Sequence, residues 1–167
     1  MTVTIIVEDG SCVPNANSYI DVEYATQYLE DRGVTVPAED KLKPMLINAM
    51  DFMESLNRYK GKRTNQDQEL QFPRSGLYSD GVEIPGNTIP VAIKRAQAQL
   101  VADTVQSGKP LLSNSTSYAL KKRVLGPLTL EYAVGQSAVL ESASPHPRFW
   151  ALINDYLRRS GSQGVMR

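Results

Sequence analysis

Apolar residues recur at helical spacing in three segments of the chain. In the first, about residues 19–31, Ile20, Tyr24 and Tyr28 fall on one face. The second covers about residues 40–57, and the third follows Thr88. Their stripes predict amphipathic helices, with the buried positions Leu42, Met45, Ala49, Phe52 or Met53 and Leu56 in the second, and Ile93, Ala96, Leu100 and Thr104 or Val105 in the third.

Capping residues indicate where these helices begin and end. Ser18 is the expected N-cap of the first helix, in an acidic variant of the capping box. Pro44 should lie in the first turn of the second helix, where a missing amide proton costs least. Thr88 is the expected N-cap of the third helix, which tolerates Pro90 in its first turn. The first and third helices should close on glycines, Gly33 and Gly108.

The ends of the chain predict a strand and a further helix. Residues 2–7 are rich in β-branched side chains and stop before Gly10, which favours a short strand. Residues 136–147 form a linker rich in Ser, Ala and Pro. Residues 148–160 predict a short last helix, followed by a flexible tail.

Residues 118–134 alternate between apolar and polar positions around Gly126-Pro127, which predicts a β-hairpin. A three-residue turn starting at Leu125 keeps the apolar residues on one face and sets Lys121 opposite Glu131. A two-residue turn moves Lys121 and Arg123 onto the apolar face. Because the hydrophobic pattern normally fixes the register, we favour the three-residue turn.

A long connection, residues 58–90, separates the second and third helices. It is dense in Gly, Pro, Arg and aromatic residues, and connections of this length are usually functional or disordered. Its apolar residues favour an ordered excursion that packs on the body of the protein; these anchors are Tyr59, Phe72, Leu77, Tyr78 and Ile84.

Together these elements predict a mainly α fold: a small helical bundle with a long ordered loop, a β-hairpin and an extended C-terminal arm. We divide the chain into two parts. Residues 1–134 form the helical-bundle domain, with the hairpin at 118–134. Residues 135–167 form a linker and a C-terminal docking helix with its tail.

The net charge is zero, but its distribution is uneven. Up to Asn57, ten acidic residues face three basic ones, a net of −7, and the remainder carries fifteen basic and eight acidic residues, a net of +7. Such a division favours contact between the acidic part of one copy and the basic part of another, because opposite potentials orient association. The alternative is an ordinary scatter of charge over one compact surface.

Little in the sequence suggests catalysis. His146 is the sole histidine and lies in a Pro-His-Pro linker, and Cys12 is the sole cysteine, which excludes an internal disulfide. We find no phosphate-binding glycine loop and no metal-ligand motif, so we expect neither an enzyme nor a cofactor. No segment approaches the ~20 apolar residues of a membrane span, and the N-terminus lacks the features of a signal peptide.

A basic cluster opens the long connection: Arg58, Lys60, Lys62 and Arg63, with Tyr59 between them. These residues could bind nucleic-acid phosphates and stack a base. Basic residues after a helix also complement the helix dipole, and the acidic Asp67 and Glu69 follow closely.

An ordered series of motifs runs over about residues 15–134. They are Asn17-Ser18-Tyr19-Ile20, residues 46–52 leading into 59–64, residues 71–76, Asp80-Gly81, Ile84-Pro85, residues 89–96 and residues 122–133. Together they resemble a family of tailed-bacteriophage virion proteins. Some of its members carry the label "putative DnaT-like single-stranded DNA-binding protein", and the family is similar to head–tail adaptor (connector) proteins.

The resemblance implies a structural protein of the virion, made in the host cytoplasm and placed at the head–tail junction. Twelve copies would form a ring between the portal and a stopper or tail-completion protein, with weak, non-specific contact to double-stranded DNA in the lumen. The alternative is a single-stranded-DNA-binding accessory protein of replication.

For the adaptor, we expect a set of interface residues on the long connection and on the last helix. Aromatic residues are enriched at interface hot spots, which favours Phe149 and Trp150 as anchors. The alternative for that helix is packing on its own bundle. The expected interface residues are Arg58, Tyr59, Lys60, Lys62, Arg63, Phe72, Arg74, Phe149, Trp150 and Tyr156, of which Lys60, Lys62 and Arg63 could face DNA.

Overall fold

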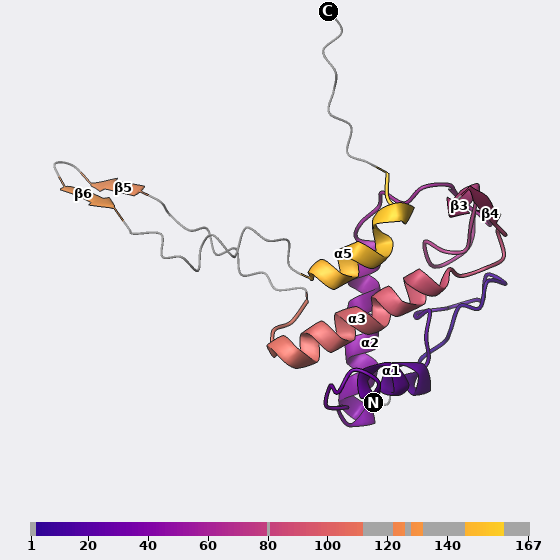
Figure 1. The fold of residues 1–167 in the computed structure, drawn as a ribbon, viewed down its shortest axis with the longest axis horizontal. Coiled ribbons are helices and arrows are strands. Elements are labelled where there is room, and N and C mark those ends of the chain that lie inside the picture. Colours follow the sequence, from indigo (N-terminus) through magenta and orange to yellow (C-terminus); the bar gives the residue numbers. More distant parts are fainter. Residues whose placement is uncertain (1–2, 80, 112–121, 126–127, 132–145, 159–167) are drawn as a thin grey trace, which may run out of the picture.

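The computed structural model describes residues 3–79, 81–111, 122–125, 128–131 and 146–158. It confirms a mainly α fold, built on α1 (Val22–Glu30), α2 (Glu39–Glu54), α3 (Val91–Ser107) and α5 (Pro147–Ile153). Figure 1 shows α2 and α3 crossing, with α1 at one end of α2 and α5 toward the other. None of the helices in the described ranges is long and apolar enough to cross a membrane.

Helix α1 begins later than its sequence pattern suggested. Its N-cap is Asp21, whose side chain accepts a 2.7 Å hydrogen bond from the amide of Tyr24. The prediction of Ser18 as the cap was wrong, because Ser18 is fully buried and donates its hydroxyl to the carbonyl of Ile20. Gly33 takes the expected left-handed conformation after the helix, at φ +63°.

Two further helix starts differ from expectation. Helix α2 begins at Glu39, which moves Pro44 from the first turn into the second, where its missing N–H leaves one intrahelical bond unmade. The N-cap of α3 is Pro90, while the amide of Thr88 is engaged in a turn with the carbonyl of Pro85. Gly108 closes α3 in the left-handed conformation, as expected.

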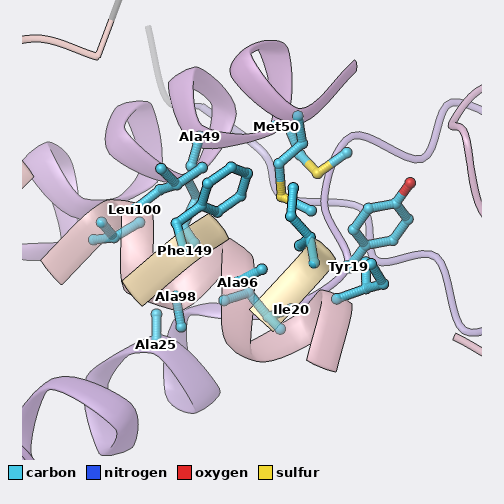
Figure 2. Close-up of a cluster of buried hydrophobic side chains, with 14 of the residues drawn as sticks. Tyr19, Ile20, Ala25, Ala49, Met50, Ala96, Ala98, Leu100 and Phe149 are labelled. Atoms are coloured by element: carbon cyan, nitrogen blue, oxygen red, sulfur yellow. The ribbon is translucent and has the colours of Figure 1, made fainter. Parts of the chain in front are cut away.

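Helix α3 lies at the centre of the bundle. It contacts α1, α2 and α5, so its burial extends beyond one stripe to eight residues. Alanines on three helices let these elements approach closely, and Figure 2 shows their side chains among larger ones such as Leu100 and Phe149. These alanines are Ala25, Ala49, Ala96 and Ala98.

The expected N-terminal strand is absent from the described residues, where Val7 makes only a single parallel bridge with Ser18. Two backbone bonds join the segments, from the amide of Glu8 to the carbonyl of Ser18 at 2.8 Å and from the amide of Asn17 to the carbonyl of Ile6 at 2.9 Å. The Asn17 side chain adds two more, accepting from the amide of Ile6 at 2.8 Å and donating to the carbonyl of Thr4 at 2.9 Å.

The connection between α2 and α3 is an ordered excursion with two small strand pairs. Strand β1 (Lys62–Arg63) pairs with β2 (Arg74–Ser75), and β3 (Leu77–Ser79) pairs with β4 (Val82–Ile84), both antiparallel. Of the expected anchors, Tyr59, Phe72 and Leu77 are buried and Ile84 is half-buried. Tyr78 is 61% exposed, because neighbouring strand residues point to opposite faces and Leu77 takes the inner one.

The hairpin register differs from the one we favoured. Strands β5 (Lys122–Leu125) and β6 (Leu128–Glu131) place Leu125 opposite Leu128 and Lys122 opposite Glu131, which corresponds to a two-residue connection. Figure 1 shows this hairpin apart from the helices, and its register follows the length of its connection, as is usual in hairpins. Residues 118–121 and 132–134 of the predicted hairpin lie outside the described residues.

The last helix packs on its own bundle. Helix α5 runs against α3 and is followed by a 3₁₀ turn, η1 (Asn154–Tyr156). It is shorter than predicted because Leu157 turns to an extended conformation and bridges Tyr59. The division of the chain after residue 134 stays a prediction, but residues 146–158 share the core of the bundle.

Candidate functional site

Five exposed basic residues gather beyond the C-terminal end of α2, and we call them the basic surface: Arg58, Lys60, Lys62, Arg63 and Arg158. The last comes from the far end of the chain. The amide of Lys60 donates to the carbonyl of Tyr156, and the amide of Arg158 donates to the carbonyl of Arg58, both at 2.8 Å. This backbone pairing brings Arg158 into a cluster that the sequence pattern had limited to residues 58–63.

None of the residues of the basic surface forms an ion pair with a carboxylate in the described part of the chain. The ion pairs found there are Lys43–Glu39 and His146–Asp103. The Lys60 ammonium instead donates to the backbone carbonyl of Asp155 at 2.7 Å. The Arg58 guanidinium lies 5.4 Å from the ring centroid of Trp150. The surface therefore offers positive charge beside an aromatic ring, the combination that favours polyanions or an acidic partner surface.

Arg74 serves the loop itself and is only 7% exposed. Its guanidinium donates to the carbonyls of Lys60 at 2.7 Å, Gly61 at 3.1 Å and Gln71 at 3.1 Å. Burial lowers the pKa of Arg74, and the like charges of Arg158 and Arg63 lower it further. A role of Arg74 at an interface stays a prediction, and in the folded chain its donors are used to join the two sides of the excursion.

Phe72 is another expected interface residue that the fold encloses. Its ring makes edge contacts with Tyr19, Tyr59 and Tyr156 at centroid distances of 6.0, 5.1 and 6.4 Å. Its amide donates to the Tyr19 hydroxyl at 3.0 Å, and that hydroxyl donates to the Glu54 carboxylate at 3.3 Å. Burial raises the pKa of Glu54 and that of the Tyr59 hydroxyl.

The expected interface residues thus fall into two groups. Tyr59, Phe72, Arg74 and Phe149 are buried in their own chain, and Phe149 is fully enclosed beside Phe52 at 5.5 Å. Trp150 and Tyr156 are half-buried. The exposed residues that keep the interface prediction open are Arg58, Lys60, Lys62 and Arg63, which include the three expected to face DNA.

A second charged surface lies on α1, and we call it the acidic surface: Asp21, Glu23, Glu30 and Asp31, all exposed. Glu23 and Glu30 make no hydrogen bond or ion pair with the described residues. Glu8, by contrast, does not add to the surface charge. It is fully buried, and its carboxylate accepts from the amides of Gly10, Cys12 and Val13 at 2.8–3.0 Å.

The sequence offered two residues for possible catalysis, His146 and Cys12. His146 is the N-cap of α5, in the left-handed region at φ +65°, and its Nδ1 lies 2.9 Å from the Asp103 carboxylate. It therefore ties α5 to α3. Burial raises the pKa of the Cys12 thiol, which disfavours the reactive thiolate. Among residues that the structure describes, no group of His, Cys, Asp and Glu could hold a metal ion.

Comparison with known proteins gives one match, to a family model described as "Putative DnaT-like ssDNA binding protein", over residues 3–167. No curated protein and no solved structure matches the chain. The match extends from the N-terminal segment through the bundle to the last residue, and so includes both charged surfaces. The chain therefore belongs to this DnaT-like family.

Proposed function

We propose that this protein is a structural, non-enzymatic subunit of a bacteriophage virion, a head–tail adaptor that joins the portal to a stopper or tail-completion protein. Twelve copies form the ring, and DNA passes through its lumen with weak, non-specific contacts. A chain of zero net charge suits that passage, because strong binding of the phosphate backbone would hinder it.

The observation that carries this proposal is the β5–β6 hairpin, which lies apart from the helices in Figure 1. An isolated two-stranded hairpin is at best marginally stable in water. Contact with a neighbouring subunit or with the portal would stabilise it. A small helical body with a hairpin that extends away from it suits a subunit that contacts its neighbour in a ring.

The test is electron microscopy of purified portal mixed with the protein, with a hairpin variant and its control. Thr129 pairs with Val124 inside the ladder, so Thr129→Pro fixes φ at about −65° and restricts the preceding residue in a strand that needs extended backbone, whereas Thr129→Ala leaves the backbone free to stay extended. We expect added ring density with the native chain and with Thr129→Ala, and its loss with Thr129→Pro. A folded native chain that adds no density to the portal would contradict the adaptor.

A second candidate function is binding of single-stranded DNA in replication. It is favoured by the family description and by the basic surface, whose five exposed cations include Arg58, 5.4 Å from the ring centroid of Trp150. Oligonucleotide binding titrated with salt would measure it. Replacing Arg58, Lys60, Lys62 and Arg63 by Ala should then abolish binding, and replacing the exposed Lys41 and Lys109 should not. High affinity with a steep salt slope, lost only in the first variant, would overturn the adaptor.

A further inference from the structure

The acidic and basic surfaces lie at opposite ends of α2. Helix α2 has 16 residues and rises about 1.5 Å per residue, so its ends are about 24 Å apart. Figure 1 places α1 near the start of α2, and the basic surface begins at Arg58, shortly after its C-cap Ser55. The Debye length at physiological salt is about 8 Å, so the two surfaces of one molecule cannot neutralise each other.

Each surface keeps charge that forms no ion pair with a described residue. Three cations border α1: Lys43 pairs with Glu39 at 2.7 Å, the Arg32 guanidinium is stacked 3.4 Å over the ring of Tyr28, and Arg95 forms no ion pair with a described carboxylate. On the other surface, Asp155 contributes its backbone carbonyl to Lys60, and its carboxylate forms no ion pair with a described residue. Like charges gathered in this way repel one another, and an opposite surface relieves the repulsion.

We propose that the acidic surface of one copy docks on the basic surface of a second copy. The inference rests on the proposed ring and names the surfaces through which its subunits meet. The two surfaces are different patches at opposite ends of α2, so the contact is heterologous. Each copy binds one neighbour through its acidic surface and the other neighbour through its basic surface. Repeated contacts of this type close into a ring when the rotation between copies allows it.

A charge-swap experiment tests the docking. The acidic reversal carries Glu23→Lys with Glu30→Lys, and the basic reversal carries Lys62→Glu with Arg63→Glu. All four side chains are exposed, so the fold should persist, and circular dichroism checks this. The control carries Lys41→Glu with Lys109→Glu, outside both surfaces. Self-association is measured by sedimentation velocity at low and high salt, with and without portal.

We expect each reversal alone to weaken self-association by about tenfold or more, because like charges then face each other. Mixing the two variants should restore association, since the reversed surface of each matches the other. A chain with both reversals should also associate. The control should behave as the native chain does.

Several outcomes would overturn the inference. One is unchanged association of both reversals, and another is failure of the mixture to recover. A basic reversal that loses oligonucleotide binding while still associating would assign the basic surface to nucleic acid. If both reversals form native rings on the portal, the docking fails and the adaptor stands. If the native chain neither associates nor binds the portal, the adaptor itself fails.

Discussion

The amide of Arg158 donates a 2.8 Å hydrogen bond to the carbonyl of Arg58, across a separation of one hundred residues in the chain. This bond and its neighbour from Lys60 to Tyr156 form a short antiparallel pairing on either side of the bridge between Tyr59 and Leu157. The end of the chain thereby holds the start of the long excursion in place. The shape of the basic surface depends on residues that follow α5.

Shortening Leu157 should loosen this pairing. Its side chain is 4% exposed, and Leu157→Ala should lower the free energy of unfolding by about 2–3 kcal/mol through lost burial and a cavity. Urea denaturation measures the change. Ala151→Ser, on the exposed side of α5, is the control and should stay within about 0.5 kcal/mol of the native chain. An equal effect of both variants would contradict the role given to Leu157.

Replacing Arg74 by Lys should destabilise the protein although the charge is kept. A lysine cannot reproduce the planar fork that reaches the carbonyls of Lys60, Gly61 and Gln71. Leaving these part-buried acceptors unpaired should cost about 1–2 kcal/mol in thermal or chemical unfolding. Arg63→Lys, on the exposed strand β1, is the control for replacing an arginine by lysine in this region. We expect it to leave the free energy of unfolding nearly unchanged.

Gln97 joins three parts of the core and should not tolerate an apolar replacement. Its side-chain oxygen accepts from the amide of Tyr19 at 2.9 Å, and its nitrogen donates to the Ser18 hydroxyl at 2.8 Å and the Leu46 carbonyl at 3.2 Å. Gln97→Leu should cost about 3 kcal/mol, because buried polar groups lose their partners. Gln106→Leu, exposed on α3, is the matched control. A stable Gln97→Leu variant would show that the core repacks around the loss.

Glu54 should make stability depend on pH. Burial raises its pKa above the ordinary 4.5, so the folded state binds its proton more strongly than the unfolded state does. Its contribution is therefore fully present below about 4.5 and is lost as the pH rises through the folded pKa. Glu54→Gln removes the titration. The stability of this variant relative to the native chain should rise as the pH increases from acid toward neutrality, and a constant difference would contradict the assignment.

Residues close in sequence determined much of the fold. The spacing of apolar residues located α1, α2 and α3, and Gly33 and Gly108 marked helix ends because the left-handed conformation favours glycine. The anchors Tyr59, Phe72 and Leu77 indicated that the long excursion is ordered. Each of these signals acts within a few residues of its own position, which is why the sequence alone carries it.

Only the tertiary structure decided what those residues contact. Arginine and phenylalanine are common at interfaces, but packing with distant parts of the chain buries both Arg74 and Phe149. Serine is a typical N-cap residue, but the Ser18 hydroxyl instead accepts a hydrogen bond from the Gln97 side chain on α3. The basic surface gained Arg158 through backbone pairing, which depends on geometry and not on side-chain type. The sequence by itself determined helices, turns and the uneven charge, and the fold determined which charges remain exposed for a partner.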